Sequence, residues 1–202
     1  MTNKTTTIHL VRHGKVHNPH NKYYGRLPGF HLGEEGRAQA KATAKELSQY
    51  PIAAIFSSPM ERAIETAEEI LNQFDGLDFQ ISELLSEVYT PFDGQLLSTV
   101  AERNWDVYSG TNPPYEQPSD VLGRVKEFFT RVQNIYQGGQ VVAITHGDVV
   151  AFTILWALGK QLTSVQKQTL YKDYIDYASI SSFTFHINSK EELPEFKYFS
   201  PS

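Results

Sequence analysis

Two short segments, far apart in the chain, each combine an apolar run with a histidine and a glycine. Residues 8–14 read IHLVRHG and residues 141–147 read VVAITHG. A short apolar run that stops at a turn residue is typical of a buried strand in a parallel sheet. Ligand sites of open α/β sheets lie just beyond the carboxyl ends of such strands. We therefore expect His13 and His146 to meet at one edge of a sheet.

Two arginines accompany these histidines. Arg12 directly precedes His13, and Arg62 follows a further apolar run at 52–56. Guanidinium groups bind phosphate oxygens through paired hydrogen bonds. A helix that begins near Gly147 would add its backbone N–H groups and its dipole. Together these groups predict a pocket for an oxyanion such as phosphate.

Chemistry on a phosphate in this pocket needs an attacking atom, and the residue types narrow the choice. The chain contains no cysteine, and no strand end carries an Asp-x-Asp pair of the aspartyl-phosphate type. Histidine can act as a covalent nucleophile when its attacking nitrogen is unprotonated. Neighbouring arginines disfavour the imidazolium form, and a backbone carbonyl bonded to the other nitrogen would fix the tautomer. His13 is therefore the candidate nucleophile.

The remaining apolar pattern alternates between strands and helices. Apolar runs predict strands at 6–11, 52–56, 79–81, 141–145, 178–186 and 196–199. Helical spacing predicts helices at 33–48, 59–74, 99–105, 120–135 and 149–158. Ser58 and Ser119 are the expected N-caps of the second and fourth of these helices. The alternation predicts an α/β fold with a mostly parallel sheet.

Length and composition limit the class of protein. The chain has 202 residues, 40% of them hydrophobic, which predicts a single domain over 1–202 with an irregular cover insertion at about 82–118. A net charge of -5 does not favour a nucleic-acid or anionic-membrane surface. Residues 1–7 lack the apolar core of a signal peptide, and the apolar run 149–158 is too short to span a membrane. The lack of cysteine fits a reducing compartment, so we expect a cytoplasmic protein.

Three sequence blocks carry a family resemblance. They are LVRHG at 10–14, SSPMERAIETA at 57–67 and THG at 145–147. In this order and spacing they resemble the histidine phosphatase superfamily, in its phosphoglycerate-mutase-like branch with the Arg-His-Gly motif. The resemblance implies a three-layer α/β/α sandwich with helices on both faces of the sheet.

The resemblance also implies roles for individual residues. His13 would become phosphohistidine, and Glu87, after the leucines of the insertion, would be the proton donor. The groups that hold the phosphoryl group would be Arg12, Arg62, His146, Gly147 and Asn18. Lys15 and Val16 stand where the family usually has Glu and Thr. This departure leaves the substrate open.

Several assignments have alternatives. Glu83 and Asp93 compete with Glu87 as the acid, and Asn18 is also suited to an Asn-Pro turn. His13, His17 and His20 have helix-like spacing, but the Gly and Pro among them argue against a helical metal site, so we expect no metal and no cofactor. Four residues of the same loop could line the substrate entrance or pack within the loop: Tyr23, Tyr24, Arg26 and Phe30.

The sequence thus predicts a metal-independent phosphatase that acts on a small phosphorylated substrate, with no nucleic-acid or membrane partner. A phosphoglycerate mutase is the first alternative, because it would use the same phosphohistidine. A catalytically silent phosphate-ligand module on the same fold is the second. The oligomeric state is left open, a homodimer included.

Overall fold

The computed structural model describes residues 5–186 and 193–201. Residues 1–4, which belong to the 1–7 segment expected not to be a signal peptide, lie outside the described residues. The strands are β1 (Thr5–Arg12), β2 (Ile52–Ser57), β3 (Phe79–Ile81), β4 (Gln140–Thr145), β5 (Ile180–His186) and β6 (Glu195–Phe199). They form one sheet in the order β3-β2-β4-β1-β5-β6. Strands β1 to β4 are parallel, whereas β5 is antiparallel to both its neighbours. The sheet is therefore mostly parallel, as predicted.

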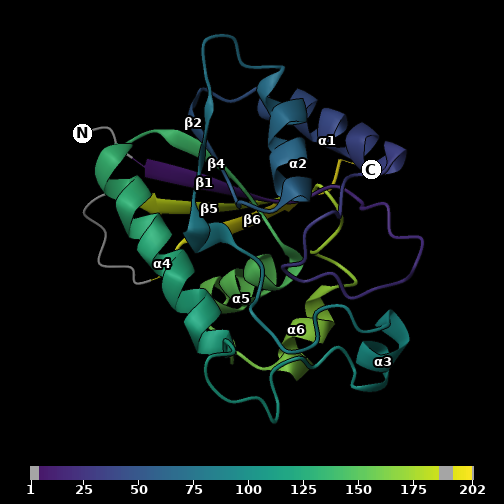
Figure 1. Cartoon of the computed structure of the whole chain (residues 1–202). Helices are drawn as coiled ribbons and strands as arrows, with labels where there is room; N and C mark the ends of the chain where they lie inside the picture. The colour runs from purple at the N-terminus through teal and green to yellow at the C-terminus, as the bar shows by residue number, and fades with distance from the viewer. Residues whose placement is uncertain (1–4, 187–192, 202) are drawn as a thin grey trace.

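Helices cover both faces of this sheet. They are α1 (Glu34–Leu47), α2 (Glu61–Leu71), α3 (Leu97–Glu102), α4 (Pro118–Ile135), α5 (Gly147–Ala157) and α6 (Ser164–Leu170), with a 3-10 turn η1 at Glu83–Leu85. Helices α1 and α2 lie on one face, and α4 and α5 lie on the other (Figure 1). Because strand side chains alternate, Leu10 packs with α4 and α5 while Val11 packs with α1 and α2. This confirms the three-layer α/β fold.

Two helices begin at positions other than those predicted. The N-cap of α2 is Met60 rather than Ser58. The Ser58 hydroxyl instead meets His146, with Oγ 2.7 Å from Nε2, so a bond to a buried imidazole replaces the cap. The N-cap of α4 is Gln117 rather than Ser119, because Gln117 forms a reciprocal capping box with Asp120.

Left-handed backbone explains two more differences. The helix predicted at 99–105 ends at Glu102, because Asn104 and Trp105 have φ values of 53° and 58°. The strand predicted from Ala178 begins at Ile180, because φ of Ala178 is 56°. Such angles are incompatible with a continuing α-helix or strand of L-residues. Helix α6 was not predicted at all.

The register of the parallel strands brings the sequence motifs to one edge. Arg12 at the end of β1 pairs with Thr145 at the end of β4, so His13 and His146 leave the sheet side by side. The backbone N–H of His13 donates to the Thr145 carbonyl at 3.0 Å, and that of Ser58 donates to the Ile144 carbonyl at 2.9 Å. The predicted meeting of the two histidines is therefore a consequence of strand pairing.

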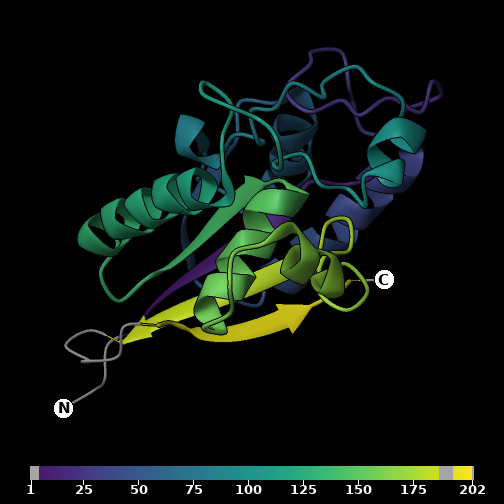
Figure 2. The ribbon, with the colours of Figure 1, turned by 90° about the horizontal axis from the view of Figure 1, so that it is seen from below.

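Two irregular segments lie together near this edge, the loop 13–33 after β1 and the insertion 82–117 between β3 and α4 (Figure 2). Tyr23 N–H donates to the Gln95 carbonyl at 2.7 Å, and Leu97 N–H donates to the Asn21 carbonyl at 2.8 Å. These backbone bonds fix the two segments to each other.

Among the described residues, no helix is both long and apolar enough to cross a membrane.

Candidate active site

His13 is held in the tautomer that a nucleophile requires. Its Nδ1 lies 2.8 Å from the Gly14 carbonyl oxygen, so Nδ1–H donates and Nε2 keeps its lone pair. Burial lowers the pKa of His13 well below 6.5, and the charges of Arg62 and Arg12 lower it further. The imidazole is therefore neutral at physiological pH. The sequence predicted a carbonyl acceptor, and Gly14 supplies it.

Gly14 also fixes where this turn lies. A Cβ on Gly14 would stand 2.4 Å from the Gly36 carbonyl oxygen, so only glycine allows α1 to approach this closely. The Gly14 N–H donates to Thr66 Oγ1 of α2 at 3.1 Å. The turn that carries His13 is thus clamped between two helices of one layer.

Arg12 is oriented by aromatic rings and a carbonyl. Its Cζ lies 3.9 Å from the centroid of the Tyr177 ring and 5.8 Å from that of Tyr171, and its Nη1 donates to the Ile175 carbonyl at 2.6 Å. Its Nε is buried with no hydrogen-bond partner in the described part of the chain. A Cβ on Gly147 would come within 3.4 Å of that Nε, so glycine leaves room beside the unpartnered donor.

Arg62, on α2, joins the loop after β1 to the second histidine motif. Its Nη2 donates to the Gly25 carbonyl at 2.8 Å and to His146 Nδ1 at 3.0 Å. His146 therefore carries its proton on Nε2, which donates to Ser58 Oγ. Burial lowers the pKa of His146 well below 6.5, with Arg62 and His13 adding to the effect. Like Arg12, Arg62 has a buried Nε without a partner among the described residues.

The buried Nε–H groups of Arg12 and Arg62 lower the stability of the fold while they have no partner, and a bound anion would supply one. Burying a polar group without a hydrogen bond costs about 1–3 kcal/mol. Arg12 and Arg62, which carry these two Nε–H groups, both act electrostatically on His13, whose ring centroid is 5.3 Å from that of His146. A phosphoryl group bound here would satisfy both donors. This is the electrostatic arrangement that phosphoryl transfer requires.

Glu87 faces this cluster from the insertion. Its Oε2 lies 3.8 Å from Arg62 Nη2 and 3.7 Å from His146 Nδ1, and its Oε1 accepts the Val88 N–H at 2.9 Å. Burial raises the pKa of Glu87 above 4.5, although the Arg62 charge opposes the shift. A carboxyl with a raised pKa at this position can act as a proton donor.

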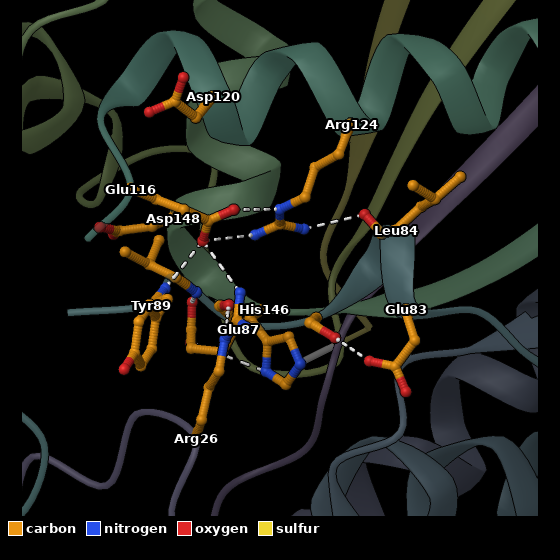
Figure 3. A network of polar contacts seen from close by, with 12 residues as sticks. Arg26, Glu83, Leu84, Glu87, Tyr89, Glu116, Asp120, Arg124, His146 and Asp148 are labelled. Carbon is orange, nitrogen blue, oxygen red and sulfur yellow. Dashed lines mark hydrogen bonds and ion pairs between the residues drawn. The ribbon is translucent and has the colours of Figure 1, made fainter. Parts of the chain in front are cut away.

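A network of ion pairs holds Glu87 in place (Figure 3). Arg26 Nε donates to the Glu87 carbonyl at 2.7 Å, while its Nη2 contacts Glu116 Oε2 at 3.0 Å. Glu116 also accepts from Arg124 Nε at 2.8 Å and from the Tyr89 N–H at 2.8 Å. The insertion is thus fixed to the loop after β1 and to α4 through one carboxylate.

A second carboxylate organises the far side of the site. Asp148, next to Gly147 in α5, accepts from Lys167 Nζ at 2.8 Å, Tyr108 OH at 2.6 Å and Tyr171 OH at 2.7 Å. Although burial acts to raise the pKa of Asp148, Lys167 and these hydrogen bonds lower it on balance. Because Tyr171 also faces Arg12, the cluster helps to place the Arg12 guanidinium.

A cavity of about 800 Å³ opens at these groups. Arg12, His13, Glu87 and Gly147 line it together with residues of the loop after β1, the first turn of α1, the insertion and α6. Arg62 and His146 are 1% and 0% exposed and lie behind this lining. The Tyr24 ring, which does line the cavity, has its centroid 4.7 Å from the Arg62 Cζ.

The structure separates the remaining alternatives. Asn18 lines the cavity, but its amide bonds to Lys22 at both ends, with Oδ1 3.0 Å from the Lys22 N and Nδ2 2.8 Å from its carbonyl. Its side chain therefore closes the Asn-Pro turn in this conformation. Glu83 accepts the Ser86 hydroxyl at 3.1 Å, and Asp93 accepts the Arg26 N–H at 3.0 Å. Neither carboxylate lines the cavity, whereas Glu87 does.

The four loop residues of uncertain role divide into two pairs. Tyr23 and Tyr24 line the cavity, whereas Arg26 supports the insertion and Phe30 packs on the Tyr24 ring with centroids 5.2 Å apart. Within residues 5–186 and 193–201, no group of three or more His, Asp or Glu side chains is arranged to hold a metal ion.

The sequence analysis assigned no role to three further residues that line this site. Lys167, Tyr171 and Tyr177 come from α6 and the loop that follows it. No motif marks them, and the short pattern SVQKQTL of α6 has too few apolar positions to identify a helix. The only available signal was Asp148, a carboxylate next to Gly147 in an otherwise apolar segment.

The family is shown by comparison with known proteins. A model of the histidine phosphatase superfamily (branch 1) matches residues 8–193. An uncharacterised protein of Mycobacterium tuberculosis is 35% identical over 164 residues, covering 78% of this chain and 81% of that protein. Phosphoserine phosphatase 1 of Hydrogenobacter thermophilus is 30% identical over 146 residues, covering 68% and 69% of the two chains.

A solved structure shows the same fold. The mycobacterial glucosyl-3-phosphoglycerate phosphatase superposes with a TM-score of 0.75 at 23% identity, covering 96% of this chain and 97% of that one. The chain belongs to the histidine phosphatase superfamily, as its three motifs indicated.

Proposed function

We propose that this protein is a metal-independent phosphatase that hydrolyses phosphate monoesters through a phosphohistidine on His13. The observation that carries the proposal is the arrangement around this imidazole. Nδ1 is bonded to the Gly14 carbonyl, and two arginines next to it present unpartnered buried Nε–H groups. Relatives with phosphatase names, among them the phosphoserine phosphatase, support the reaction class.

The proposed reaction has two steps. In the first, the His13 Nε2 lone pair attacks phosphorus in line, the ester P–O bond breaks, and the Glu87 carboxyl gives its proton to the leaving oxygen. In the second, the Glu87 carboxylate takes a proton from water as that water attacks phosphohistidine. The N–P bond breaks, inorganic phosphate leaves, and His13 and Glu87 return to their starting states.

The arginines stabilise charge during both steps. Arg12 and Arg62 would bind the equatorial phosphoryl oxygens, and each has a buried Nε–H without a partner among the described residues. His146 would donate to the same oxygens in its other tautomer, with the proton on Nδ1. In that tautomer the Ser58 hydroxyl donates to Nε2, and the bond from Arg62 Nη2 to Nδ1 is replaced by one to the phosphoryl group. The backbone N–H groups at the start of α5 would complete the binding site.

Hydrolysis of p-nitrophenyl phosphate in excess EDTA tests the proposal, with His13→Ala beside the wild type. We expect turnover by the wild type and none above background by the variant. His20→Ala, at an exposed histidine of the same loop that does not line the cavity, is the matched control. Acid-labile phosphorylation of the wild type that is absent in His13→Ala would identify the intermediate. Turnover that survives in His13→Ala would overturn the assignment.

A further inference from the structure

The cavity is much larger than the group that His13 attacks. Its volume of about 800 Å³ is that of a site for a whole small molecule. The phosphate-binding groups account for only one part of its lining. The rest of the lining must therefore contact the leaving alcohol and select among alcohols.

Every lysine that lines this cavity is already paired with a carboxylate. Lys167 is 2% exposed, and its Nζ lies 2.8 Å from Asp148 Oδ2 and 3.0 Å from the Trp105 carbonyl. Lys15 Nζ lies 2.6 Å from Glu35 Oε2. A second anionic group on a substrate would therefore have to compete with these carboxylates for a cation.

The competition differs between the two lysines. Lys167 is buried, so drawing its ammonium away from Asp148 would leave a buried carboxylate without its cation at a large cost. The Lys15 pair is exposed and weak. However, an anion that reached Lys15 would lie close to both Glu34 and Glu35, which line the same cavity.

The N-terminus of α1 does not supply a free anion site either. Glu34 and Glu35 form its first turn, so two carboxylates already complement the positive end of the helix dipole. The remaining lining holds apolar and aromatic side chains, among them Val16, Pro19, Tyr23, Leu97 and Trp105, and the polar side chains of His17, Asn18, Asn21 and Gln168. The apolar and aromatic side chains pack against carbon skeletons, and the amides can hydrogen-bond hydroxyl groups without adding a positive charge.

We propose that this cavity selects phosphate monoesters whose leaving alcohol carries no negative charge. The proposal rests on the proposed function, because it names the substrate class of the same site. Arg12 and Arg62 serve the transferred phosphoryl group, and no further unpaired lysine or arginine lines the cavity in the described part of the chain. Glu34 and Glu35 add negative charge to this lining, which disfavours a second anion on the substrate.

Two matched pairs of substrates isolate the charge. Glycerol 3-phosphate and 3-phosphoglycerate differ in a terminal hydroxymethyl or carboxylate group. Phosphoethanolamine and O-phosphoserine differ only in the presence of a carboxylate. We expect the carboxylate member of each pair to have a kcat/KM lower by about tenfold or more, because it brings an unpaired charge to these carboxylates. A carboxylate member that is hydrolysed as well as its partner, in either pair, would overturn the proposal.

A charge variant tests the cause of the discrimination. Glu34→Gln removes one carboxylate from the cavity lining, and Glu68→Gln makes the same change at an exposed position of α2 away from the cavity. We expect Glu34→Gln to reduce the penalty on 3-phosphoglycerate, relative to glycerol 3-phosphate, by about two- to threefold. Glu68→Gln should leave that ratio unchanged. Equal ratios in both variants would show that the cavity carboxylates do not set the selectivity.

Failure of this proposal can be told from failure of the proposed function. If the wild type hydrolyses p-nitrophenyl phosphate but does not discriminate within the two pairs, only the selectivity is wrong. If it hydrolyses no phosphomonoester, the proposed function is wrong. Calorimetric Kd values for the same two pairs then test the selectivity, with tighter binding of the uncharged members expected and equal binding contradicting it.

Discussion

Arg62 donates from Nη2 to His146 Nδ1 at 3.0 Å, although the two residues are 84 positions apart in the chain. The same Nη2 reaches the Gly25 carbonyl at 2.8 Å. One guanidinium therefore connects α2, the loop after β1 and the start of α5. A lysine at this position would lack the separate Nε–H, which is buried without a partner among the described residues and can bind an anion.

We predict that Arg62→Lys lowers kcat/KM for p-nitrophenyl phosphate by on the order of 10²-fold, with the fold retained. The charge stays in the site, but the link to His146 and the second donor for phosphate are lost. Arg131→Lys, in the exposed pair with Glu127 on α4, is the matched control and should behave as wild type. Wild-type kinetics for Arg62→Lys would remove Arg62 from phosphate binding.

The role of Glu87 predicts a dependence on the leaving group. Its carboxyl is 3.7 Å from His146 Nδ1, and a positioned acid contributes about 10²–10⁴ in rate. Glu87→Gln should therefore slow hydrolysis of alkyl phosphates far more than that of p-nitrophenyl phosphate, whose leaving group needs no proton. Equal losses on both substrates would exclude Glu87 as the acid. Glu83→Gln, outside the cavity, should leave both rates unchanged.

The pH dependence of activity follows from two shifted pKa values. His13 must be neutral to attack, and burial places its pKa well below 6.5, so activity should persist as the pH falls through 6.5. Glu87 must be protonated, and burial raises its pKa above 4.5, so activity should decline as the pH rises through that raised value. We expect kcat/KM for an alkyl phosphate to be bell-shaped, rising as His13 loses its proton and falling as Glu87 loses its own. A rate that climbs steadily from pH 5 to pH 9 would contradict both assignments.

Glu116 is predicted to act through Glu87 rather than on substrate. Its carboxylate is 16% exposed and accepts from Arg26, Arg124 and the Tyr89 N–H. Glu116→Gln should cost about 2 kcal/mol of unfolding free energy, because two arginines lose a partly buried partner. It should also lower kcat for alkyl phosphates by about tenfold, through misplacement of the acid.

The leaving-group dependence separates positioning from simple destabilisation. If Glu116 positions Glu87, aryl phosphate hydrolysis should fall less than alkyl phosphate hydrolysis in Glu116→Gln. Glu127→Gln, which breaks an exposed pair on α4, is the control for loss of an ion pair alone. Proportional losses on both substrate types would mean that Glu116 has only a structural role.

The sequence predicted the centre of this site because that centre depends on strand ends. The residues after β1 and β4 are adjacent whenever those strands pair in parallel, so His13 and His146 could be placed from two apolar runs. Glu87 came from the family resemblance, since nothing in its local pattern distinguishes it from Glu83. Its place in the cavity lining, which Glu83 lacks, depends on the Arg26 and Glu116 contacts, which join segments that are distant in sequence.

Other parts of the site could not be predicted from local pattern. Lys167 and Tyr171 contact the site through Asp148, and these bonds exist only after α6 packs on α5. Ser58 fits the sequence rule for an N-cap, but its hydroxyl bonds to His146 instead, and Met60 is the N-cap of α2. That residues 1–202 form one domain, and that the protein is cytoplasmic, stay predictions.

The unfolding free energy should depend on pH through the three buried histidines, His9, His13 and His146. His9 lies outside the site. It is 3% exposed, with Nε2 2.9 Å from Gln140 Oε1 and Nδ1 2.8 Å from Ser182 Oγ. Burial lowers the pKa of His9 below 6.5, although the bond to Gln140 opposes the shift. The unfolded chain therefore binds a proton more readily than the folded one. This stabilisation is complete above pH 6.5 and is lost as the pH falls through 6.5 towards the folded-state pKa.

We predict that the unfolding free energy, measured by urea titration, is lower at pH 5.5 than at pH 7.5. Each such histidine contributes up to about 1.4 kcal/mol per pH unit below 6.5, and His13 and His146 add to the effect with the same sign. The raised pKa of Glu87 acts in the opposite sense. His9→Gln isolates one contribution, because all other groups are shared with the wild type. Its stability should fall less steeply with decreasing pH, and parallel curves for the two proteins would show that His9 is not held neutral by the fold.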